Sequence, residues 1–196
     1  MIITSDFEVA QPVEKVWTFF DDIPQVASCL PGAELTEDLG DGKYKGRVAI
    51  RMGPVRLQFA GTAGIVERDQ AAKMIVVDAA GADEKGRGQA AMKVSARLSA
   101  KGRGTQVDVT QDLQLSGAAA QYGRGMIGDF SAIMMRDFSA NMQDRIERLE
   151  RGETAEQISA AAAGSQVKGI SLAMRAARLA LSRVFRRFFL PYQPAT

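Results

Sequence analysis

Residues 92–115 read M-K-V-S-A-R-L-S-A-K-G-R-G-T-Q-V-D-V-T-Q-D-L-Q-L, and their spacing sets the class of fold. On both sides of Lys101–Gly104, apolar residues stand at every second position except Gln111, with Lys, Ser, Arg, Asp, Thr and Gln between them. Strict alternation of this kind is typical of strands with one buried and one solvated face. The glycine-containing segment between the two runs predicts a hairpin turn. We therefore expect two antiparallel strands of a half-buried sheet.

The same period of two recurs along the chain. It covers Ile2–Val9, resumes at Ala33, and predicts further strands at 43–51, 55–59 and 74–77, with a polar loop at 81–88. Helical spacing after Pro12 and again near Pro24 predicts two short helices between the first strand and the second. From Gly117 to Glu150 the apolar period becomes helical again. The order is one strand, two short helices, six strands and one long helix, which predicts an α+β fold in which the helix covers the dry face of a curved seven-stranded antiparallel sheet.

Charge divides the chain into a body and a tail. Residues 157–196 contain six basic residues and no acidic one, whereas the rest of the chain carries 19 basic and 23 acidic residues. We predict a ligand-binding domain at 1–150, a Gly/Ala/Ser/Glu linker at 151–166 and a basic amphipathic tail at 167–196. The linker behaves as flexible coil or, through its alanine run, as helix.

The tail forms, on a helical projection, one apolar and one purely basic face. This pattern is typical of a helix that lies in the interface of an anionic membrane, although it also suits a helix that packs on the body or on a partner protein. Nucleic acid is a weaker interpretation because adjacent phenylalanines suit lipid better than phosphate. The predicted membrane-binding residues are Arg175, Arg178, Leu181, Arg183, Val184, Phe185, Arg186, Arg187, Phe188 and Phe189.

Composition excludes several kinds of chemistry. The chain has no histidine, so serine–histidine and cysteine–histidine nucleophile pairs are excluded, and so are most zinc sites. Its single cysteine, Cys29, cannot form an internal disulfide. The N-terminus lacks the apolar run of a signal peptide. We expect a non-enzymatic protein without a metal, in the cytoplasm and peripheral on the inner face of the cell membrane.

Three features predict an apolar ligand cavity between sheet and helix. The long helix begins with several glycines, which are unfavourable in a helix interior and indicate close backbone approach or a segment that opens. Methionines gather on this helix and in the sheet, where flexible thioethers suit an adaptable pocket but also fill ordinary cores. Gln111 stands between Val109 and Leu113 on the buried side of its strand, where its amide needs a partner: a ligand carbonyl, a buried water or a backbone group.

The predicted ligand-binding residues are the inward-facing apolar residues of these elements together with two polar ones. They are Trp17, Phe20, Val48, Ile50, Leu57, Phe59, Met92, Val94, Leu98, Val109, Gln111, Leu113, Tyr122, Met126, Ile127, Phe130 and Met134.

Four short motifs, in this order, carry a resemblance to a known family. They are P-V-E-K-V-W at 12–17, C-L-P-G-A-E at 29–34, G-P-V at 53–55 before F-A-G at 59–61, and A-Q-Y-G-R-G at 120–125 followed by Ile127. Residues 1 to about 150 with these motifs resemble the G-subunit family of the carbon monoxide dehydrogenase system, which is part of the START-like (SRPBCC) superfamily and has the helix-grip fold.

The resemblance implies a companion of a molybdenum-containing CO dehydrogenase, or of a related hydroxylase, that links it to the cytoplasmic membrane. It also implies a cavity for apolar molecules, and an isoprenoid quinone, menaquinone or ubiquinone, is the ligand that gives such a companion a role in electron transfer. A non-redox anchor or assembly factor is the alternative, and an aromatase/cyclase-type enzyme is a third. The resemblance supplies no catalytic residue.

Overall fold

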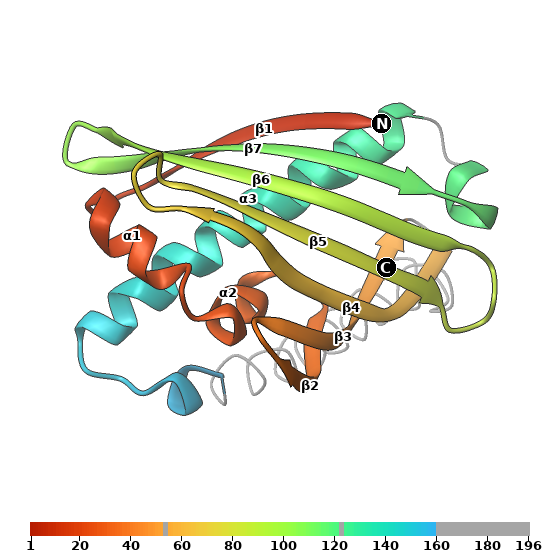
Figure 1. Ribbon diagram of the computed structural model, residues 1–196, viewed down its shortest axis with the longest axis horizontal. Coiled ribbons are helices and arrows are strands. Elements are labelled where there is room, and N and C mark those ends of the chain that lie inside the picture. Colours follow the sequence, from red (N-terminus) through yellow and green to blue (C-terminus); the bar gives the residue numbers. More distant parts are fainter. Residues whose placement is uncertain (53–54, 122–123, 160–196) are drawn as a thin grey trace, which may run out of the picture. The chain divides into compact units, whose positions relative to one another are not determined.

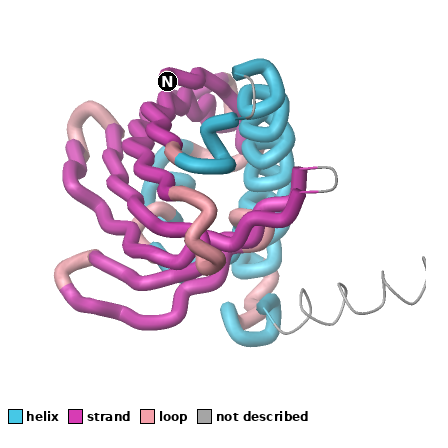
Figure 2. Tube along the Cα trace, turned by 90° about the vertical axis from the view of Figure 1, so that its right-hand side faces the viewer, coloured by secondary structure: helices cyan, strands magenta, loops and turns pink. Residues whose placement is uncertain are grey.

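The computed structural model describes residues 1–52, 55–121 and 124–159, and the chain divides into two units, Met1–Arg151 and Gly152–Thr196. The first unit is a sheet that curves around one long helix (Figures 1 and 2). Its elements are β1 (Ile2–Val9), α1 (Val13–Phe19), α2 (Ile23–Cys29), β2 (Ala33–Gly40), β3 (Lys43–Met52), β4 (Val55–Asp69), β5 (Met74–Asp83), β6 (Gln89–Lys101), β7 (Gly104–Leu115), η1 (Gly117–Gln121) and α3 (Arg124–Glu150).

Within the described residues, seven strands form one antiparallel sheet in the order β1-β7-β6-β5-β4-β3-β2. The α+β class and the element order predicted from the sequence are confirmed. Two strands are longer than predicted: β4 continues past Phe59 to Asp69, and β5 extends into the expected loop as far as Asp83. The residues there are mostly Gly, Ala and Thr, so apolar and polar side chains do not alternate clearly. The backbone hydrogen bonds between these two strands do not depend on side-chain size, and they continue through this segment.

The long helix starts later than predicted. Gly117–Gln121 forms a 3₁₀ turn, and α3 begins only at Arg124. Gly117 has a φ of +66°, and the Ala118 amide donates to the Arg87 carbonyl oxygen at 2.6 Å. The positive φ marks the turn from β7 into η1, and this bond joins η1 to the β5–β6 loop at one end of the sheet.

The apolar core fills the other end. It lies between α1, α2, the C-terminal half of α3 and the adjoining ends of the strands (Figure 1). Phe7 and Phe138 meet edge to face there, with ring centroids 5.9 Å apart, and Val16, Val107 and Met142 are completely buried. We call this cluster the solid end of the body.

Only the first residues of the second unit are described. Residues 155–159 are helical, and Thr154 and Gln157 cap this turn reciprocally, since each backbone amide donates to the other side chain. The rest of the predicted linker and the whole predicted tail at 167–196, with the membrane-binding residues from Arg175 to Phe189, lie outside the described residues. In the part of the chain that the structure describes, no helix combines the length and apolar character needed to cross a membrane.

Candidate functional site: an apolar cavity between the sheet and α3

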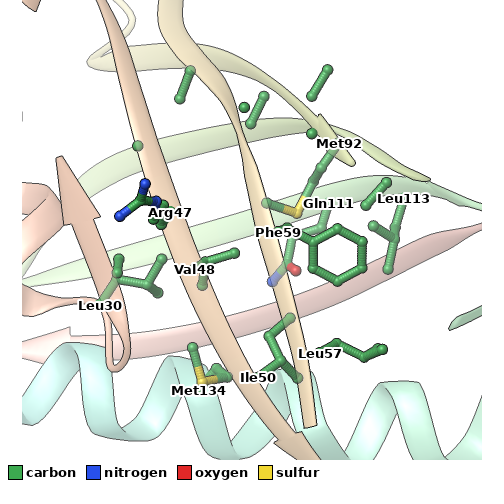
Figure 3. Close-up of a pocket in the computed structure, with 18 of the residues that line it drawn as sticks. Leu30, Arg47, Val48, Ile50, Leu57, Phe59, Met92, Gln111, Leu113 and Met134 are labelled. Carbon is green, nitrogen blue, oxygen red and sulfur yellow. The ribbon is translucent and has the colours of Figure 1, made fainter. Parts of the chain in front are cut away.

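A cavity of about 340 Å³ lies between the inner face of β3–β7 and the N-terminal half of α3 (Figure 3). Its wall is made largely of aliphatic and aromatic side chains from the strands, with Ile127, Phe130 and Met134 from the helix. Small-molecule sites in proteins occupy roughly 300–1,000 Å³ and are mostly apolar. The volume and lining therefore suit a mainly apolar ligand of modest size.

The cavity exists because several residues on the inner face of the sheet are glycine or alanine, which have little or no side chain to fill the space. Gly46, Gly61, Gly81 and Ala90 face one another across β3, β4, β5 and β6 in register. A Cβ at Gly61 would overlap the Ala80 carbonyl oxygen, so neighbouring backbones approach more closely here than side chains permit. The row of small residues bends the sheet and leaves the space above it unfilled.

Ten of the seventeen residues predicted to bind a ligand line this cavity. They come from four strands and from α3, and they are Val48, Ile50, Leu57, Phe59, Met92, Gln111, Leu113, Ile127, Phe130 and Met134. Ligand contact by these residues remains a prediction.

Five others belong to the solid end. Trp17, Phe20, Leu98 and Val109 are buried in the apolar core, and Val94 packs against it. The inward alternation of the strands was predicted correctly, but alternation does not tell which end of a strand meets solid packing. At these positions α1 and the C-terminal half of α3 fill the space over the sheet, so the side chains have no access to the cavity.

Of the α3 residues predicted to bind a ligand, Ile127, Phe130 and Met134 face the cavity, whereas Met126 does not. Met126 is 52% exposed, and Ile133 is 49% exposed. The inward row runs through Ile127, Ser131 and Met134, because α3 packs on β1 and α2 in this orientation. Tyr122 lies outside the described residues.

Gln111 and Ser131 are buried polar residues of the cavity wall. The contacts of Gln111 decide which ligand suits the cavity. Gln111 is 6% exposed, and its Oε1 accepts a hydrogen bond from the Ser131 hydroxyl at 3.1 Å. Among the described residues, its Nε2 has no hydrogen-bond partner. The Ser131 hydroxyl can satisfy only one end of the amide, so one polar atom is left over whichever way the amide is turned. Figure 3 shows this side chain reaching into the pocket.

At the cavity end of the sheet, the ion pair between Asp83 and Arg87 joins β5 to the β5–β6 loop, outside the cavity itself. Asp83 accepts from Arg87 through both carboxylate oxygens, at 2.7 and 2.8 Å, and also from the backbone amides of Gln58, Lys85 and Arg87. The Arg87 side chain, followed by these amides, holds the pKa of the Asp83 carboxyl well below its usual range. Arg87 also donates to the Arg56 carbonyl, so the pair ties β4 to the β5–β6 loop.

Several lining residues were missed from the sequence. Leu30 follows α2, Ser131 and Met135 lie on α3, and Ala63 and Ala79 lie beside the glycine row. A usable signal for the row was present: glycines inside strands mark close backbone approach or a ligand. Ser131 could not be found from the sequence because its pairing with Gln111 depends on how α3 lies on β7.

Comparison with known proteins agrees with this architecture. The family model for the G subunit of carbon monoxide dehydrogenase (CoxG) matches residues 6–147. No curated protein gives a significant match. Among solved structures, a conserved protein from Geobacillus kaustophilus is 22% identical, with a TM-score of 0.67 over 76% of this chain and 96% of that one.

Two more distant neighbours have the same fold. The Zhui aromatase/cyclase from Streptomyces sp. R1128 is 18% identical, with a TM-score of 0.55 over 79% of this chain and 97% of that one. A START superfamily protein from Mycobacterium smegmatis is 14% identical, with a TM-score of 0.51 over 76% of this chain and 98% of that one. At such identities these likenesses establish the helix-grip fold predicted above, and the fold alone.

Proposed function

Because this chain belongs to the CoxG family of carbon monoxide dehydrogenase proteins, we propose that its body carries a respiratory quinone between the membrane and a molybdenum-containing dehydrogenase. Menaquinone and ubiquinone both have the required chemistry: an apolar ring and prenyl chain with carbonyl oxygens on the ring. The dehydrogenase would reduce the quinone, and this chain would return the quinol to the bilayer. The substrate of the dehydrogenase would be carbon monoxide or that of a related hydroxylase.

The observation that carries the proposal is the Nε2 of Gln111. A buried amide N–H without an acceptor is destabilising by about 1–3 kcal/mol. Here the donor lies in the wall of an apolar cavity, where a ligand carbonyl would satisfy it. A ligand made only of hydrocarbon would leave the Gln111 N–H without an acceptor, whereas a quinone carbonyl would accept its hydrogen bond. The geometry therefore favours an apolar ligand that has at least one hydrogen-bond acceptor.

The size of the cavity supports a ring with the first part of a prenyl chain. A volume of about 340 Å³ is at the lower end of the range for small-molecule sites, so a long isoprenoid tail would extend beyond it. Val48, Phe59 and Leu113 would surround the ring and exclude water, and Gln111 would orient it. Carrying a quinone requires no redox or acid–base group from the chain itself, which lacks histidine and has a single, buried thiol.

The membrane half of the proposal rests on the sequence of the tail. Six basic residues with an apolar face and no acid are suited to an anionic inner leaflet, where each Arg or Lys contributes roughly 1 kcal/mol. The linker would let the body reach both the bilayer and the dehydrogenase.

A calorimetric titration of the full chain with menaquinone-4 tests the ligand assignment. We expect Gln111→Leu to weaken quinone binding about tenfold, equivalent to about 1.4 kcal/mol, because the donor to the carbonyl is lost. Binding of a prenyl hydrocarbon of similar length, which has no carbonyl, should be unchanged or stronger. The matched control is Gln114→Leu, the same change on the same strand at an exposed, outward-facing position.

Two results would reject the quinone. One is the absence of binding by the unsubstituted chain, and the other is an equal loss for the quinone and the hydrocarbon with Gln111→Leu. Normal support of the dehydrogenase by a variant that binds no quinone would instead favour an anchor or assembly factor. Turnover of an aromatic polyketide by the pure chain would favour the cyclase alternative.

A further inference from the structure

Two exposed apolar side chains lie on α3 beside the cavity. Met126 and Ile133 are 52% and 49% exposed, and they are seven residues apart, so they lie two turns apart on one face. Their chain neighbours Ile127 and Met134 line the cavity. Single exposed apolar residues are ordinary on a protein surface, but these two lie on one helix face and border the site.

Two arginines stand across from this helix on the β3–β4 hairpin. Arg51 and Arg56 are paired directly opposite each other in the ladder, and both are exposed. Like charges in this arrangement repel each other. Neither has an acidic partner among the described residues, whereas Arg47 on the same strand pairs with Glu84 at 3.1 Å. An external anion would relieve the repulsion.

The cavity joins these two features. Ile50 and Leu57, the neighbours of the arginines, line the cavity together with Ile127 and Met134. Figure 2 shows the described end of the β3–β4 hairpin reaching past α3 on the side away from the other strands. The apolar residues on α3 and the arginines on the hairpin therefore both adjoin residues that line the same cavity.

We propose that this rim, defined as Arg51, Arg56, Met126 and Ile133, docks on an anionic lipid surface and turns the cavity toward the bilayer. The inference rests on the proposed function, since it concerns how the apolar ligand enters. Met126 and Ile133 insert among the acyl chains, and the two arginines bind lipid phosphates. Asp129 lies between the two apolar residues on the helix and sets a limit to the depth of insertion, because its carboxylate stays in water.

Chemistry and charge favour lipid over a protein partner. Two arginines without an acidic partner on the rim complement a surface of phosphates, and thioether and aliphatic side chains enter acyl chains without needing a shaped counterpart. The rim is also distinct from the tail: it belongs to the described body, and it orients the cavity rather than only holding the chain near the membrane.

Site-specific fluorescence on the full chain tests the orientation. Burial raises the pKa of the Cys29 thiol to about 11, so a cysteine introduced at an exposed position can be labelled selectively near neutral pH. We would label Met126→Cys or Ile133→Cys with an environment-sensitive dye. The probe is a vesicle of phosphatidylcholine and phosphatidylglycerol that contains lipids with a quencher on the acyl chain. The control label is Val66→Cys, which is 54% exposed at the far end of β4.

The expected result is strong quenching and a blue shift at positions 126 and 133, and neither at position 66. Arg51→Gln and Arg56→Gln should each weaken the association that quenching reports about fivefold on these vesicles and have little effect on pure phosphatidylcholine. Arg103→Gln, at the exposed β6–β7 turn, is the charge control and should have no effect.

Equal responses at 66 and 126 would overturn the inference, as would the absence of vesicle binding by the full chain. A chain that binds vesicles through its tail while position 126 stays in water would also overturn it, and would leave this face to a protein partner. These failures are separate from failure of the proposed function, because quinone titration without vesicles does not depend on the rim.

Discussion

Phe7, Trp17 and Phe138 fill the space between sheet and helix at one end of the body, whereas Gly46, Gly61 and Gly81 leave it open at the other. Strands β4 to β7 and helix α3 contribute residues to both ends. They differ in the size of the inward side chains and in what covers them. α1, α2 and the C-terminal half of α3 cover the solid end. η1 and the first turns of α3 cover the end that contains the cavity, which we call the hollow end.

The difference separates stability from binding. Close packing at the solid end supplies most of the favourable burial, and it fixes α3 on the sheet. The hollow end gives up this packing and is held instead by polar links, namely the Asp83–Arg87 pair and the bond from Ala118 to Arg87. A ligand site can be placed there because the remainder of the body keeps the fold.

Truncating one methionine at each end should give the largest contrast. Met142→Ala, at a completely buried position, should lower the free energy of unfolding by about 2–5 kcal/mol. Met134→Ala should lower it by less than about 1 kcal/mol, since that side chain already borders empty space. Urea unfolding of both variants measures the difference. Equal losses would show that the cavity is packed in solution.

Replacing one alanine at each end by phenylalanine tests the opposite change, the addition of side-chain volume. Ala96→Phe overfills the solid end and should lower the free energy of unfolding by about 1–3 kcal/mol. Ala79→Phe places its ring in the cavity, so the fold should tolerate it while quinone binding is lost. Thermal unfolding and calorimetric titration of the two variants separate the effects. Quinone binding that survives Ala79→Phe would place the ligand elsewhere.

Acid should weaken the hollow end first. The folded-state pKa of Asp83 is held below its unfolded value, which is about 3.9. The carboxylate therefore stabilises the fold above that pH, and this stabilisation is lost as the pH falls through the folded-state pKa. Asp83→Asn should make the free energy of unfolding less dependent on pH below about 4. A parallel pH series of urea unfolding on the two proteins checks this.

Hydrogen exchange then locates the loss. The Ala118 amide, which depends on the Arg87 loop, should exchange faster in Asp83→Asn at neutral pH, while the amide of Val107 at the solid end should not change. Uniform acceleration at both ends would mean that the pair supports the whole body rather than the cavity end.

Much of this fold could be predicted from periodicity. The alternation in residues 92–115 indicated the β6–β7 hairpin, although β6 begins earlier, at Gln89. The sequence order of elements pointed to a helix on a seven-stranded sheet. The errors fall where local pattern is weak. In β4 and β5, Gly61 and Ala79 carry no periodic signal, and only pairing with the neighbouring strand keeps them extended.

Part of the candidate site could also be predicted from the pattern along single segments, and the rest depended on how those segments pack together. Gln111 could be found because a glutamine stood on a face that was otherwise apolar. Its partner could not, because Ser131 is ordinary in a helix until α3 is laid against β7. Met126 was assigned to the inward side because its helical spacing from Phe130 suits one apolar face, but the packing of α3 on β1 and α2 leaves it exposed.

The order of residues along the chain was enough to establish which of them alternate, where the chain turns, the chemistry that the absence of histidine removes, and the basic character of residues 157–196. Packing in three dimensions determined which inward residues meet solid core and which meet space. The reason is that a cavity belongs to no single segment: it arises where small residues on four paired strands fall in register under one half of a helix. Register and helix rotation are set by contacts between distant parts of the chain, and these contacts leave no periodic trace along it.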